Sequence, residues 1–71
     1  MVKPTKVTNS IRAIREAAGL TQADLAKQIG VTRQTLIAIE QGKYSPTLEL
    51  AFQISRVFGI GLDELFQYPE V

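Results

Sequence analysis

Apolar residues recur along this chain at spacings of three and four, which is the period of one face of an α-helix. Leu25, Ala26 and Ile29 fall on one such face, and Leu36 and Ile39 fall on another. The residues between them are mostly polar and lie on the opposite faces. The spacing of apolar residues in the middle of the chain therefore predicts two short amphipathic helices that pack against a shared core.

Capping residues set the limits of these two helices. Thr21 begins the first one, because its hydroxyl can accept a free backbone N–H and Asp24 completes a capping-box-like pair. Gly30 ends it, since glycine takes the left-handed conformation that a C-cap needs. Thr32 then caps the second helix.

The turn between the helices decides how they pack. Gly30 and Thr32 leave too few residues for antiparallel packing, so the helices must cross at a steep angle. The sequence therefore predicts a helix-turn-helix over about residues 21–42, with a recognition helix over about 33–41. The alternative is a helical hairpin that only builds a core.

Three further helices are predicted. One runs from about Thr8 or Asn9 to Ala18, a fourth runs from a Thr47 cap to about Phe58, and a short fifth covers residues 62–66. The fold class is thus all-α, a five-helix domain in which residues 1–71 form a single unit. We expect these outer helices to turn the following side chains toward the core: Ile11, Ile14, Ala18, Leu48, Ala51, Ile54, Ser55 and Phe58.

The two ends of the chain leave alternatives open. Val7 with its neighbours and Gln67–Tyr68 are short runs that either pair as a small two-stranded ribbon or fray. Lys3 and Lys6 either form an arm along DNA or belong to a solvated tail.

Composition narrows the class of protein. A chain of 71 residues with 45% hydrophobic residues has one small core and is too apolar for disorder. No apolar run is long enough to span a membrane, and the first residues lack the apolar stretch of a signal peptide, so we expect a cytoplasmic protein. The chain has no Cys and no His, so we expect no metal, no cofactor and no enzymatic activity.

Charge is unevenly distributed although the net charge is only +1. Residues 1–46 carry seven Lys/Arg against three Asp/Glu, a net +4, and residues 47–71 carry one against four, a net −3. The basic part contains the predicted helix-turn-helix. Such asymmetry favours one face toward phosphate and another away from it, with chance scatter as the alternative.

More apolar residues lie near the C-terminus than a small domain can bury alone. Leu50, Phe52 and Val57 fall off the main stripe of the fourth helix. A contiguous exposed apolar patch marks an interface, so we expect a homodimer, with closure of the monomer core as the alternative. The expected dimer residues are Ile60, Leu62, Leu65, Phe66 and Tyr68.

From about Ile11 to Phe66 the chain resembles the lambda-repressor/Cro-like (XRE) family of DNA-binding regulators. The resemblance implies a five-helix fold, a homodimer on a palindromic operator and, usually, repression. It is carried by Gly19-Leu20-Thr21-Gln22, Leu25-Ala26, Gly30-Val31-Thr32, Ile39-Glu40-Gln41-Gly42-Lys43 and Pro46-Thr47-Leu48.

The resemblance also implies residues that read bases. Arg33 and Gln34 open the recognition helix, where Arg can bond guanine O6 and N7 and Gln can bond adenine N6 and N7. Ile37 and Ala38 lie one turn further on and have no polar group to offer, so we expect them to pack against thymine methyl groups. Family members often carry a polar residue there, so base reading here is either partly apolar or concentrated on the first two residues.

Other positions match family residues that contact the DNA backbone. Gln22 corresponds to the residue whose side chain and N–H meet a phosphate at a helix N-terminus. Such contacts set register without reading sequence. For Tyr44 a packed loop anchor is an equal alternative. The remaining expected backbone contacts are Thr32, Thr35 (to a phosphate or a base), Gln41, Lys43, Tyr44 and Ser45.

Arg15 and Glu40 have a different expected role. By resemblance they pair as a buried or half-buried ion pair that joins the first helix to the third and fixes the recognition helix. Its net contribution to stability is small, since desolvation offsets the attraction.

Together these features predict a sequence-specific regulator that binds double-stranded DNA, a homodimeric repressor on an inverted-repeat operator. The alternative is a protein-binding module of the same fold, such as an antitoxin with a protein partner.

Overall fold

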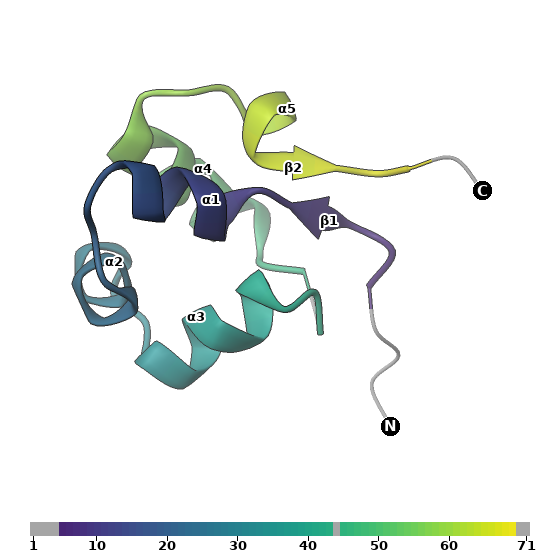
Figure 1. The fold of residues 1–71 in the computed structure, drawn as a ribbon. Helices are drawn as coiled ribbons and strands as arrows, with labels where there is room; N and C mark the ends of the chain where they lie inside the picture. Colours follow the sequence, from purple (N-terminus) through teal and green to yellow (C-terminus); the bar gives the residue numbers. More distant parts are fainter. Residues whose placement is uncertain (1–4, 44, 70–71) are drawn as a thin grey trace.

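The computed structural model describes residues 5–43 and 45–69, which form five helices and one pair of very short strands. Figure 1 shows the helices gathered around a common centre, with the strand pair projecting to one side. This arrangement confirms the predicted all-α, five-helix, lambda-repressor-like fold. In chain order the elements are β1 (Thr8–Asn9), α1 (Ile11–Ala17), α2 (Gln22–Ile29), α3 (Arg33–Glu40), α4 (Leu48–Phe58), α5 (Leu62–Leu65) and β2 (Phe66–Gln67).

Threonine caps begin the three central helices, as predicted. The Thr21 hydroxyl accepts the Asp24 N–H at 3.0 Å, and the Asp24 carboxylate accepts the Thr21 N–H at 3.0 Å, so the capping box is complete. The Thr32 hydroxyl accepts the Thr35 N–H at 3.1 Å at the start of α3. Thr47 does the same for α4. Each cap satisfies a backbone donor that the helix cannot pair internally.

The first helix starts later than the sequence predicts, because Asn9 belongs to a strand. Its Oδ1 accepts the Ile11 N–H at 3.1 Å, and its Nδ2 donates to the Ile39 carbonyl at 2.8 Å. The Asn9 side chain therefore holds the chain extended and ties it to the C-terminal end of α3. The predicted start of the helix at Thr8 or Asn9 was wrong by two or three residues.

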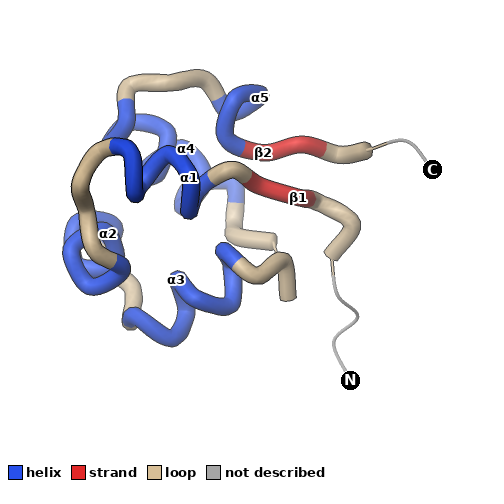
Figure 2. The backbone as a smooth tube through the Cα atoms, viewed as in Figure 1, coloured by secondary structure: helices blue, strands red, loops and turns tan. Residues whose placement is uncertain are grey.

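The two ends pair as an antiparallel ribbon, which settles one of the open alternatives. Thr8 lies opposite Gln67 and Asn9 opposite Phe66, and Figure 2 shows the two strands side by side. The Ser10 N–H also donates to the Leu65 carbonyl at 2.9 Å. Because Phe66 joins the ribbon, α5 ends at Leu65 rather than at Phe66.

Each of the five helices contributes at least one side chain to the core. Its fully buried side chains are Ile11, Leu25, Leu36, Ile39, Ile54 and Leu65. Two predicted core residues lie outside it. Leu48 is 68% exposed because it is the first residue of α4, beyond the edge of the core, and Ala18 is exposed where α1 ends. Conversely, Leu50 and Val57 pack against the core although they lie off the predicted stripe.

Candidate nucleic-acid interface

The turn between α2 and α3 has the form that the sequence predicts. Gly30 takes a left-handed conformation with φ of +72°, which glycine adopts without steric cost. The Val31 N–H donates back to the Ala26 carbonyl at 3.0 Å. Figure 1 shows α2 almost end-on while α3 runs across the view, so the two helices cross steeply. This is the geometry of a helix-turn-helix.

One side of α3 packs against the core, and the other side faces outward. Leu36 and Ile39 are buried, whereas Arg33 and Gln34 are exposed at the start of the helix. Ile37 and Ala38 are half-buried one turn further on. The structure therefore places the four candidate base-reading residues on the outward side, with the two polar ones most accessible.

The candidate backbone contacts surround this helix. Gln41, Lys43 and Ser45 are exposed beyond its C-terminal end, where the Lys43 N–H still donates to the Ala38 carbonyl at 3.0 Å. At its N-terminal end, the Thr32 hydroxyl donates to the Thr35 hydroxyl at 3.0 Å. Tyr44, also a candidate from the sequence, lies outside the described residues.

Arg15 and Glu40 meet as an ion pair between α1 and α3. Arg15 Nε lies 2.8 Å from Glu40 Oε2, and the two side chains are only 8% and 4% exposed. Arg15 Nη1 also donates to the Leu20 carbonyl at 2.8 Å. The pair thus connects α1, the loop before α2 and the C-terminal end of α3, as the resemblance implies for its two partners.

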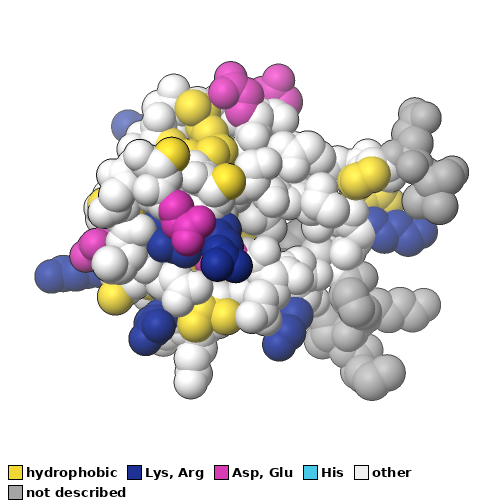
Figure 3. All heavy atoms as spheres, in the orientation of Figure 1, with side chains coloured by type: hydrophobic (Ala, Val, Ile, Leu, Met, Phe, Trp, Pro, Cys, Tyr) yellow, Lys and Arg dark blue, Asp and Glu magenta, His cyan; other side chains and the backbone are white. Residues whose placement is uncertain are grey.

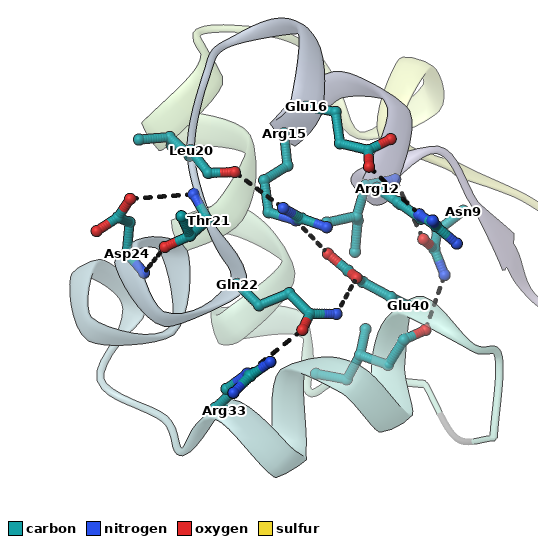
Figure 4. A network of polar contacts seen from close by, with 12 residues as sticks. Asn9, Arg12, Arg15, Glu16, Leu20, Thr21, Gln22, Asp24, Arg33 and Glu40 are labelled. Atoms are coloured by element: carbon teal, nitrogen blue, oxygen red, sulfur yellow. Dashed lines mark hydrogen bonds and ion pairs between the residues drawn. The ribbon is translucent and has the colours of Figure 1, made fainter.

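Gln22 connects this ion pair to the outward face. Its Nε2 donates to Glu40 Oε1 at 3.2 Å, and its Oε1 accepts from Arg33 Nε at 3.4 Å. Figure 4 shows the chain of contacts running from Arg15 through Glu40 and Gln22 to Arg33. The candidate phosphate contact at the start of α2 is therefore also in contact with a candidate base-reading residue.

Sequence reasoning missed Arg12. This exposed side chain lines the same surface hollow as Gln22 and Arg33. Its Nε lies 3.6 Å from Glu16 Oε2 in a pair whose side chains are 74% and 57% exposed. The available signal was its spacing of three residues before Arg15, which makes the two residues neighbours on the helix surface although only Arg12 is exposed.

The surface opposite α3 differs in charge. Figure 3 shows acidic side chains over α5, at the top of the view, whereas most of the basic side chains in this view lie lower, around α1, α2 and α3. Within residues 5–43 and 45–69 no three acidic side chains gather as a metal site would require. No helix in that part of the chain has the length and hydropathy to cross a bilayer.

The candidate dimer residues divide into two groups. Leu65 is 0% exposed and belongs to the monomer core, so its assignment to a dimer surface was wrong. It points inward because α5 is a single turn that anchors on the core through this residue. Ile60, Leu62 and Phe66 are half-buried, and Tyr68 is 69% exposed.

Comparison with known proteins identifies the family. A model of the helix-turn-helix family matches residues 11–65, which is most of the chain. The chain belongs to this helix-turn-helix family, of the XRE type. The match confirms the resemblance to lambda-repressor/Cro-like regulators, and it marks the protein as a DNA-binding transcriptional regulator.

Relatives of the chain carry the same description. It is 50% identical over 62 residues to an uncharacterized HTH-type transcriptional regulator of Methanocaldococcus jannaschii, covering 87% of this chain and 94% of the relative. It is 34% identical over 63 residues to the cryptic phage CTXphi transcriptional repressor RstR of Vibrio cholerae, covering 89% of this chain and 57% of RstR.

A solved structure shares the fold. A putative DNA-binding protein from Bacteroides fragilis superimposes with a TM-score of 0.78 at 20% identity, over 86% of this chain and 98% of the other. At that identity the likeness shows the fold alone.

Proposed function

We propose that this protein is a homodimeric repressor that binds an inverted-repeat operator and reads its bases with the N-terminal part of α3. The observation that carries the proposal is the exposure of Arg33 and Gln34 at the start of α3, a helix whose buried side is formed by Leu36 and Ile39. Arg33 has the paired donors that guanine O6 and N7 accept, and Gln34 has the donor and the acceptor that match N7 and the N6 amino group of adenine. The likeness to RstR, itself a transcriptional repressor, supports repression as the outcome.

The remaining contacts would position α3 in the groove. Lys43 supplies a charge and Ser45 a hydroxyl beyond its C-terminal end, and the N-terminus of α2 offers free N–H groups to a phosphate. Arg12 adds a second charge next to that terminus. On binding, its exposed pair with Glu16 would be exchanged for a phosphate contact at little cost.

Dimerisation would use the apolar surface on the other half of the molecule. Leu62 and Phe66 line a groove with Leu48, and Phe52 is 50% exposed on the same helix as Leu48. Because the groove also includes Ser45 and Pro46, it lies beside the loop that follows α3. A twofold axis there would present two recognition helices to one side of DNA, about one helical turn apart.

Selection of bound duplexes from a random pool tests the proposal, with the number of bound chains measured on the winning duplex. We expect an enriched inverted repeat that binds two chains. Leu62→Glu should weaken binding to the full repeat while leaving a single half-site bound as before. Uniform, salt-sensitive binding without enrichment would contradict the proposal and would direct the search to a protein partner.

A further inference from the structure

Glu40 makes one more contact than its ion pair requires. Its Oε2 accepts from Arg15 Nε at 2.8 Å, and Arg15 gains a second partner in the Leu20 carbonyl. The other oxygen, Oε1, accepts from Gln22 Nε2 at 3.2 Å. Because the Glu40 side chain is only 4% exposed, this second oxygen also needs a hydrogen-bond donor, and Gln22 supplies it.

The chemistry of Glu40 dictates how Gln22 is oriented. An ionised carboxylate has only acceptors, so the amide must turn its NH₂ group toward Glu40. The carbonyl Oε1 of Gln22 then has to face the opposite way. On that side it meets Arg33 Nε, at 3.4 Å. A flipped amide would place its NH₂ group against the guanidinium, donor against donor, and would lose both contacts.

This orientation restricts Arg33. A long arginine side chain loses rotamer entropy when it is fixed, so a free one is poorly ordered for reading a base. A contact at Nε restrains the guanidinium and leaves the two terminal nitrogens for an acceptor pair such as guanine O6 and N7. The arrangement in Figure 4 therefore orders Arg33 before DNA arrives.

We propose that Glu40 is a positioning residue for base recognition, which acts through Gln22 to orient Arg33. The inference rests on the proposed function, because it matters only if Arg33 reads a base pair. It extends the role of Glu40 beyond its ion pair with Arg15.

The test compares affinities for two duplexes. One is the selected operator, and the other carries a substitution at the base pair whose preference Arg33→Ala abolishes. The ratio of the two affinities measures discrimination at that position. Loss of a phosphate contact lowers both affinities alike and leaves the ratio unchanged. The ratio therefore separates positioning of Arg33 from general weakening.

Three variants change the chain of contacts. Gln22→Met removes both amide contacts and keeps the ion pair of Arg15 with Glu40. Glu40→Gln allows the amide of Gln22 to flip. We expect each to lower the ratio by about fivefold or more, as for a bidentate contact that is no longer held. The double variant Gln22→Glu with Glu40→Gln restores an alternating order of donors and acceptors at the same net charge, and it should recover the ratio.

Gln28→Met is the matched control, since Gln28 lies exposed on the same helix. It should leave both affinities unchanged. A ratio that stays at the wild-type value in Gln22→Met and Glu40→Gln, while Arg33→Ala abolishes the preference, would overturn the inference and leave the proposed function standing. An unchanged preference in Arg33→Ala would instead overturn the base-reading role and the inference with it. Gln22→Met keeps the test valid if Glu40→Gln fails to fold.

Discussion

The α1–α3 half and the α4–α5 half of this chain shape their surfaces with different kinds of contact. In the first half, hydrogen bonds link Arg15, Glu40, Gln22 and Arg33 from the interior to the outward face of α3. The second half exposes large apolar side chains among its polar ones, with Leu48 at 68% and Phe52 at 50% exposure. Hydrogen bonds are directional and hold their side chains in one geometry. The burial of apolar surface is not directional, so any partner surface of complementary shape stabilises it.

The difference follows from the two tasks proposed for the halves. Reading a base requires a donor at a defined position, so a rigid polar network suits α1–α3. Association with a second copy requires surface to be removed from water, which suits α4–α5. Charge follows the same division, since the basic residues concentrate before residue 47 and the acidic ones after it.

The largest expected effect comes from breaking the buried ion pair. Glu40→Ala leaves Arg15 charged and without its partner in a site where the two side chains are 8% and 4% exposed. We expect a loss of about 3–5 kcal/mol in the free energy of unfolding, measured by urea denaturation. Glu16→Ala is the control, because its pair with Arg12 is exposed and should contribute less than about 1 kcal/mol. Equal losses would show that the network does not fix the first half.

The next largest effect is the difference in unfolding free energy between alanine variants of two leucines in the second half. Leu65→Ala empties a fully buried site and should cost about 2–5 kcal/mol of unfolding free energy. Leu48→Ala should cost within about 0.5 kcal/mol, because that side chain is 68% exposed. Denaturation at a concentration too low for dimers checks both. A large loss for Leu48→Ala would mean that Leu48 is covered within a single chain.

A smaller effect is expected beyond the recognition helix. Lys43 is exposed in the loop after α3, so Lys43→Ala should weaken binding to all duplexes alike. The slope of log affinity against log salt should fall in magnitude by about 1. Titrations at several salt concentrations measure this slope. A loss confined to one sequence would instead make Lys43 a base-reading residue.

The smallest effect concerns pH. The hydrogen bond from the Thr21 N–H, with the Thr21 side chain adding to it, lowers the pKa of Asp24 below its ordinary value of 3.8. A lowered pKa in the folded state means that the carboxylate stabilises the fold above that ordinary value and loses the effect as pH falls through the lowered pKa. Asp24→Asn should therefore be less stable than wild type at neutral pH, with the difference shrinking in acid. A difference that does not vary with pH would contradict this capping role.

The sequence predicts helices better than it predicts contacts between them. The caps at Thr21, Thr32 and Thr47 act within three residues, so local chemistry reveals them. Asn9 misled the prediction because its partner, the Ile39 carbonyl, lies 30 residues away. A periodic pattern likewise identifies a helix face without showing how far the core extends along it, which is why Leu48 was misplaced.

The candidate interface shows the same limit. Exposure of Arg33 and Gln34 followed from their place on α3, because the buried residues of that helix fix its rotation. The contacts of Gln22 with Glu40 and with Arg33 span 18 and 11 residues. Sequence alone gives no orientation for such side chains. Leu65 was assigned to the surface because a one-turn helix has too few residues to define a buried side.

Selection of duplexes from a random pool, performed in parallel with wild-type protein and Arg33→Ala, tests most directly whether the N-terminal part of α3 reads bases. We predict that wild type enriches an inverted repeat and that the variant enriches the same repeat with the preference lost at one base pair in each half-site. An Arg33→Ala motif identical to that of wild type at every position would contradict base reading by this part of α3.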